Sequence, residues 1–165
     1  SFGYPSSVMS CHVSDPGNGG NAVKRAAYKF HTAIGGMLGY ELNILNTRLD
    51  VLEEIKRQIK FYRSVEDIIK NGRLYRLISP FENREELSAY YYHGADGRML
   101  LSFLQNKAAD EVKTYLLKIA AADENAAYTD TVTGKAYSGK QLKNGIEIAV
   151  SSEDEYSVIM LFEKA

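Results

Sequence analysis

Residues 4–21, YPSSVMSCHVSDPGNGGN, bring serine, cysteine, histidine and aspartate side chains together directly before a glycine-rich loop. The first part of this stretch is predicted to be a strand, and successive side chains of a strand point to opposite faces. Ser10, His12 and Ser14 therefore share one face, whereas Cys11 lies on the other. This alternation argues against a Cys11–His12 nucleophile–base pair and favours a small buried cysteine behind the strand.

Ser10, His12 and Asp15 are the candidates for the rim or the support of a substrate pocket. They lie at the carboxyl end of the predicted strand, which is where parallel α/β folds bind ligands. A hydrogen-bonded polar layer that only supports a site explains the same pattern. A hydrolase with two carboxylates needs a second acidic residue at another strand end, and none is identified beside Asp15. We therefore assign these residues no catalytic step.

The glycine loop opens a short helical segment, GNGGNAVK, and such a loop can hold a phosphate on its backbone N–H groups. It lacks the Lys-Ser/Thr ending of a P-loop and the spacing of a dinucleotide fingerprint, so a mobile loop explains it better. The three histidines, His12, His31 and His93, are far apart in the sequence. We expect no metal site and no cofactor.

The composition of the 165-residue chain limits its partners. Its net charge is −1, which disfavours nucleic acid or an anionic membrane surface as the main partner. It has one cysteine and no apolar run of membrane-spanning length, so we expect a reducing, cytoplasmic location. The chain begins with Ser1 rather than Met, and we expect it to be part of a longer protein.

The two halves of the sequence have different patterns. In the first half we predict a strand at residues 7–13, a small apolar strand at 32–38 and a helix over about 47–71. Thr47 is the expected N-cap of that helix, with Asp50 at the capping-box position. Its expected apolar face begins with Leu49. This half is predicted to be α/β.

The second half is predicted to be all-β. Eight short apolar segments between residues 73 and 165 are separated by turns, of which Asp96-Gly97 and Thr133-Gly134 are the clearest. This spacing favours an antiparallel sandwich or barrel. The run Tyr90-Tyr91-Tyr92 alternates between faces, which leaves core packing, an interface and a sugar-binding patch as interpretations.

Four stretches, in order, resemble glycoside hydrolase family 36, the bacterial α-galactosidase type. The resemblance rests on YPSSVMSCHVSD, GGMLGYELNI, IKRQIKFYRSVEDIIKNGRLYRLISPFE and KAYSGKQLKNGI, and it covers nearly the whole chain. It implies that residues 1–72 are the terminal part of a (β/α)8 catalytic barrel of the TIM type. Residues 73–165 would then form a carboxyl-terminal β-sandwich. The loop DPGNGGN departs from the Pro-Asn-His of the family, so loop contacts to substrate are not carried over.

The resemblance also implies a function. Family members hydrolyse terminal α-galactosides with retention, using one Asp in a Lys-x-Asp setting and another in a Ser-Asp-x-x-Asp setting. Neither setting occurs in this chain, so both catalytic residues are expected upstream of Ser1. The chain would support a galactoside-binding enzyme and be inactive alone. A non-catalytic carbohydrate-binding or interaction β-sandwich is the alternative.

A segment of a barrel would expose apolar surface that the rest of the barrel normally covers. We expect this surface to be covered by self-association, which would make a homo-oligomer, by rearrangement of residues 1–45, or by crystal contacts.

Overall fold

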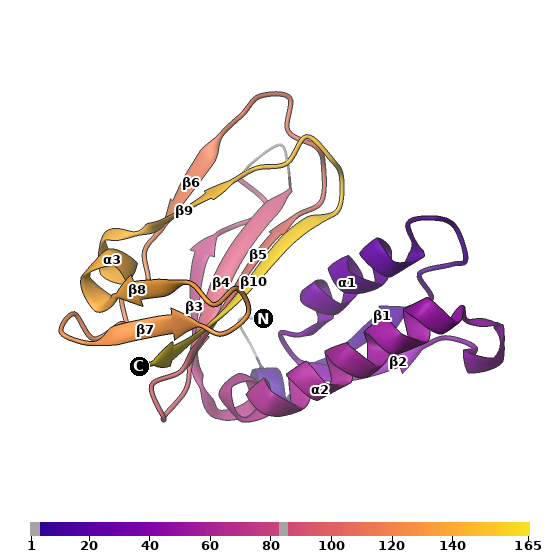
Figure 1. Ribbon diagram of the computed structural model, residues 1–165, viewed down its shortest axis with the longest axis horizontal. Coiled ribbons are helices and arrows are strands. Elements are labelled where there is room, and N and C mark those ends of the chain that lie inside the picture. The colour runs from indigo at the N-terminus through magenta and orange to yellow at the C-terminus, as the bar shows by residue number, and fades with distance from the viewer. Residues whose placement is uncertain (1–3, 83–85) are drawn as a thin grey trace. The chain divides into compact units, whose positions relative to one another are not determined.

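The computed structural model describes residues 4–82 and 86–165, and the chain divides after Asn71 into two compact units. The first unit contains a parallel strand pair and two long helices, and the second is built mainly of antiparallel strands (Figure 1). The chain is thus mostly β-sheet with a few helices.

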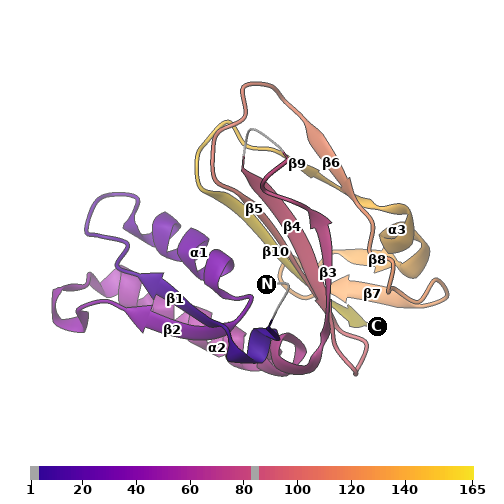
Figure 2. The same cartoon turned by 180° about the vertical axis from the view of Figure 1, so that it is seen from behind.

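The first unit is a β–α–β arrangement followed by a second helix. Its elements are the short 3-10 turn η1 (Ser6–Val8), β1 (Ser10–Ser14), α1 (Ala22–Ala33), β2 (Met37–Glu41), the 3-10 turn η2 (Ile44–Asn46) and α2 (Leu49–Asn71). β1 and β2 pair in parallel. Both helices lie on the same side of this pair, in front of it in Figure 1 and behind it in Figure 2.

Two strand predictions in the first unit are wrong in position. The first strand begins at Ser10, because the preceding residues form the turn η1. The predicted strand at 32–38 is instead the end of α1, where the Thr32 hydroxyl donates to the Tyr28 carbonyl at 2.9 Å, followed by a glycine turn. Small residues are needed here for close approach: a Cβ at Gly36 would lie 2.6 Å from the sulfur of Cys11.

The helix predicted over about 47–71 is present as α2, but it begins at Leu49, so Thr47 is not its N-cap. The Thr47 hydroxyl instead donates to the Asn43 carbonyl at 2.8 Å, and the Asp50 carboxylate pairs with Arg48. Leu49 was expected on the apolar face, yet 81% of its surface is exposed. The residues buried along the helix are Val51, Ile55, Gln58, Tyr62, Val65, Ile68 and Ile69.

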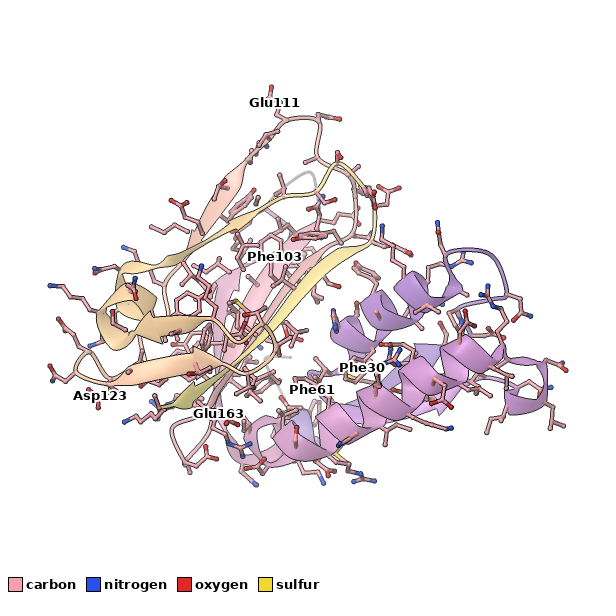
Figure 3. All side chains as sticks on the ribbon, in the orientation of Figure 1. Phe30, Phe61, Phe103, Glu111, Asp123 and Glu163 are labelled. Atoms are coloured by element: carbon pink, nitrogen blue, oxygen red, sulfur yellow. The ribbon has the colours of Figure 1, made fainter. Side chains whose placement is uncertain are left out.

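Hydrogen bonds tie this buried face of α2 to β2. The Tyr62 hydroxyl donates to the Gly36 carbonyl at 3.0 Å and accepts from the Leu38 N–H at 3.4 Å. The Tyr40 hydroxyl donates to Gln58 Oε1 at 3.1 Å. The Tyr40 side chain therefore points toward the helix, and strand alternation places Leu38 on the same face of β2 and Gly39 and Glu41 on the opposite face. At the end of α1, Phe30 meets Phe61 of α2 edge to face, with 6.4 Å between ring centroids (Figure 3).

The second unit contains the eight predicted strands. They are β3 (Arg73–Ile78), β4 (Leu87–His93), β5 (Met99–Gln105), β6 (Thr114–Leu117), β7 (Ala127–Asp130), β8 (Ala136–Ser138), β9 (Ile146–Ala149) and β10 (Tyr156–Lys164), with helix α3 (Gly139–Asn144) before β9. Six of them form one sheet in the order β3-β4-β5-β10-β7-β8, and β6 pairs with β9 in a second sheet. Both predicted turns are confirmed by positive φ at their glycines, +84° at Gly97 and +77° at Gly134.

The two sheets of the second unit share one hydrophobic core. Phe103 on the six-stranded sheet, labelled in Figure 3, is buried in it. Leu117 and Ile148 on the β6–β9 pair are buried in the same core. Tyr91 is fully buried there and stacks on Tyr75, with 4.6 Å between centroids and 3° between ring planes. The central tyrosine of the 90–92 run is therefore core.

Asp130 at the end of β7 is a fully buried carboxylate that organises its surroundings through hydrogen bonds. Its Oδ1 accepts from the N–H groups of Leu161 (3.0 Å) and Val132 (3.1 Å), and its Oδ2 accepts from the Thr133 hydroxyl (2.5 Å). One side chain thus holds the β7–β8 turn and connects it to the backbone of β10.

Replacing this carboxylate tests its contribution to stability. Asp130→Ala leaves the Leu161 and Val132 N–H groups without an acceptor, and we expect the free energy of unfolding to fall by about 2–4 kcal/mol. Asp130→Asn keeps one acceptor oxygen and is expected to lose less. Chemical denaturation of both variants measures the difference. Equal decreases in the free energy of unfolding would show that the acceptor oxygen of residue 130 is not what stabilises the β7–β8 turn.

His31 near the end of α1 makes the stability of the first unit depend on pH. Burial lowers the pKa of its imidazole to about 4, although Glu54 opposes this shift. The unfolded chain, with an ordinary pKa of about 6.5, then binds more protons than the folded chain between these two values. Stability should therefore fall as the pH is lowered from about 6.5 to about 4.

His31→Gln removes the titrating group, so we expect its thermal midpoint to fall less than that of the wild type across this pH range. Thermal unfolding followed at several pH values measures both slopes, and His93→Gln is the matched control. Parallel curves for the wild type and His31→Gln would contradict the assignment.

Candidate functional site

Polar side chains gather on the face of the β1–β2 pair that lies opposite α2. The parallel register places Ser10 beside Met37, His12 beside Gly39 and Ser14 beside Glu41. On the other face, Val13 is fully buried. The predicted shared face of Ser10, His12 and Ser14 agrees with this pattern, in which all three are exposed and Cys11 and Val13 are less so.

His12 is the centre of a short hydrogen-bond relay. Its Nε2 lies 2.8 Å from the Ser10 hydroxyl, and its Nδ1 lies 2.6 Å from Glu41 Oε1. Glu41 was not among the predicted site residues. It is 29 residues from His12 in the sequence, and the parallel pairing of the two strands brings it close.

Gly39 provides the space for the imidazole ring. A Cβ at this position would lie 2.6 Å from His12 Cδ2 and 3.0 Å from Nε2, which is closer than real Cβ contacts allow. The ring of His12 therefore lies directly over the backbone of β2, and a side chain at position 39 would displace it.

Asp15 is not part of the relay. Its carboxylate accepts from the Gly17 N–H at 2.7 Å, closing a turn at the start of the glycine loop. Lys29 of α1 holds the strand end from the other side: its ammonium group donates to the Ser14 hydroxyl at 2.8 Å and to the Asp15 carbonyl at 2.9 Å. Of the predicted residues, Ser10 and His12 are brought together and Asp15 is directed into the loop.

The glycine loop is held by contacts that do not suit a phosphate. Arg48 donates to the carbonyls of Asn18 (3.3 Å) and Gly19 (2.9 Å), and the Gly17 N–H is occupied by the Asp15 carboxylate. The Asp15 carboxylate inside the loop repels an anion, although the Arg25 guanidinium lies beside Gly17 and Gly19. These contacts favour an ordered structural loop over the nucleotide or phosphate site considered from the sequence.

The relay has the connectivity of a serine hydrolase, with serine on Nε2 and a carboxylate on Nδ1. Ser10 differs from such a nucleophile because it is the first residue of a regular strand, and it is not among the described residues with strained positive φ. Cys11 is no substitute, since burial raises the pKa of its thiol and keeps it protonated. The arrangement therefore orients hydrogen bonds and does not activate a nucleophile.

Within the described ranges 4–82 and 86–165, no three histidine, cysteine or acidic residues are grouped so that they could hold a metal ion. The same residues contain no helix that is both long and apolar enough to cross a membrane.

Comparisons with known proteins agree with the resemblance seen in the sequence. Residues 1–72 match the melibiase family. The chain is 30% identical over 159 residues to α-galactosidase AgaA of Geobacillus stearothermophilus, covering 94% of this chain and 21% of that enzyme. It is 30% identical over 157 residues to the bifunctional α-galactosidase/sucrose kinase AgaSK of Mediterraneibacter gnavus, covering 93% and 17%. The chain thus spans about a fifth of the length of these curated relatives.

Solved structures give the same result. The galactosidase domain of AgaSK superposes with a TM-score of 0.85 at 28% identity, covering 99% of this chain and 23% of that chain. The family 36 α-galactosidase AgaA from Geobacillus stearothermophilus, solved in complex with raffinose, superposes with a TM-score of 0.83 at 28% identity, covering 98% and 23%. The resemblance to the carboxyl-terminal part of family 36 α-galactosidases is confirmed.

Proposed function

We propose that this chain, a carboxyl-terminal part of the family 36 α-galactosidase type, belongs to a retaining enzyme that removes terminal α-linked galactose from galactosides. The observation that carries the proposal is the match to α-galactosidases, which covers 93–94% of the chain in sequence and 98–99% in fold. The relatives are glycoside hydrolases, and this chain is a small part of them, so we assign it a supporting role.

The first unit has the features of the end of a (β/α)8 barrel. Its two strands are parallel and joined by a helix, and both helices cover one face of the pair. The opposite face carries Ser10, His12 and Glu41. In such a barrel this second face would be turned inward, and the carboxyl ends of the strands would border the substrate. The second unit, with two sheets around one core, would be the carboxyl-terminal β-sandwich.

We propose rim or support roles for Ser10, His12 and Asp15, and no catalytic role for any acidic residue of this chain. Retaining hydrolysis needs two carboxyl groups about 5–5.5 Å apart across the scissile bond. The two acidic residues at these strand ends already serve neighbours: Asp15 accepts from Gly17, and Glu41 pairs with His12. The nucleophile and the acid/base would come from other segments of the enzyme.

The alternative, a carbohydrate-binding module formed by the second unit, is less well supported. A sugar-binding surface usually needs an aromatic ring that lies open for stacking. Each tyrosine of the second unit, in the described residues 72–82 and 86–165, is buried or half-buried, and of the phenylalanines there only Phe81 lies open, with 95% of its surface exposed. A homo-oligomer and a cytoplasmic location remain predictions.

An activity assay tests the supporting role. We expect the purified 165-residue chain to release no nitrophenol from a chromogenic α-galactoside above the rate of a heat-denatured sample, because it lacks both catalytic carboxylates. Turnover that copurifies with the chain would contradict this assignment. Loss of that turnover in the variant Glu41→Gln would then place the chemistry on this chain.

A binding measurement separates the supporting role from the binding module. We expect titration calorimetry of the intact chain with melibiose or raffinose to show no saturable heat, because no tyrosine in the described part of the second unit is exposed and Phe81 offers a single open ring. Saturable binding that is lost in a variant of a half-buried tyrosine, such as Tyr137→Ala, and kept in Ser10→Ala would favour the binding module.

A further inference from the structure

We propose that Glu41 is a positioning residue that fixes the tautomer of His12, so that the relay ends in a hydrogen-bond acceptor at the Ser10 oxygen. This inference rests on the pairing of the two strands, on the two hydrogen-bond distances at His12, and on the packing of its ring against Gly39. It concerns a residue that the sequence pattern did not indicate, and the tautomer itself does not depend on the proposed function.

The direction of each hydrogen bond follows from the chemistry of the partners. An ionised carboxylate has no hydrogen to donate, so the contact of 2.6 Å between Glu41 Oε1 and His12 Nδ1 requires the proton on Nδ1. In the neutral ring, Nε2 then has no proton and acts as an acceptor. The hydroxyl of Ser10, 2.8 Å from Nε2, must donate to it.

The backbone of β2 fixes the ring in place. Gly39 lies beside His12 in the parallel register, and a Cβ there would lie 2.6 Å from Cδ2 of the ring. Glu41 follows two residues later on the same face of β2. One strand thus supplies both the backbone surface on which the imidazole packs and the hydrogen-bond acceptor at its Nδ1.

This arrangement sets the polarity that Ser10 presents to a ligand. Its hydrogen is used by Nε2, and its oxygen keeps lone pairs free to accept a further hydrogen bond. Such an oxygen suits the hydroxyl of a sugar and disfavours a carboxylate or phosphate. This last step rests on the proposed function, since it assumes that the relay faces a sugar pocket.

Nitrogen NMR of the histidine rings tests the tautomer directly. Long-range proton–nitrogen spectra of the ¹⁵N-labelled chain are recorded at rising pH until the His12 shifts stop changing, and His12→Gln assigns the signals. We expect His12 with its proton on Nδ1. The wild-type spectrum needs no substitution in the site, and a neutral His12 with its proton on Nε2 would overturn the inference.

Substitutions of Glu41 then test which group holds the proton. Glu41→Ala removes the acceptor, and we expect the proton to move mainly to Nε2, where the Ser10 oxygen can accept it. Glu41→Gln keeps a carbonyl acceptor and should restore the Nδ1 form. Ser10→Ala is the matched control at the other end of the relay and should leave the proton on Nδ1.

An unchanged Nδ1 tautomer in Glu41→Ala would show that Glu41 does not position the ring. If Glu41 contributed only to packing or stability, the position of the His12 proton would not change with the presence or absence of an acceptor at residue 41. The spectrum reads the proton and not turnover, so an enzyme without α-galactosidase activity would contradict the proposed function and leave this inference standing.

Discussion

Strand alternation in the β–α–β segment is the constraint on which the candidate site depends. The hydrogen bond from the Tyr40 hydroxyl to Gln58 holds the Tyr40 side chain toward α2, and Leu38, two residues away, shares this face. The residues between them must then face away, with the even-numbered residues of β1 beside them. A polar relay and an apolar helix contact can therefore occupy the same five-residue strands. A shift of one residue in register would bury His12 and expose Val13.

This dependence explains how much of the site the sequence could predict. The shared face of Ser10 and His12 follows from alternation within one strand, which needs no knowledge of the fold. Glu41 joins them only through the register between β1 and β2, which tertiary packing sets. Asp15 was grouped with them because it is near in sequence, but the chain turns after Ser14, and its carboxylate bonds to the loop.

The same difference between local and tertiary information separates the correct predictions of the fold from the wrong ones. The strands of the second unit were predictable because alternation and turn glycines are local signals. The segment 32–38 was mistaken for a strand because a short apolar run with glycines has no decisive period. Leu49 was assigned to the buried face of α2, yet the packed stripe passes through Val51 and the polar Gln58. Gln58 is buried because Tyr40 and Glu54 satisfy its amide.

Buried and exposed polar groups have different roles in this chain, and this favours placing the function at the exposed relay of the first unit. In the second unit, the fully buried Gln105 bonds to the backbone of Lys107 and Ser151, much as Asp130 bonds to the backbone of its turn and of β10. Such groups hold loops, and because they are fully buried they are closed to a ligand. In the first unit, His12 and Glu41 are 44% and 64% exposed, although they are hydrogen-bonded to each other. A hydrogen bond between two exposed side chains contributes little to stability, so its worth to the protein lies in the orientation that it gives the imidazole and the serine.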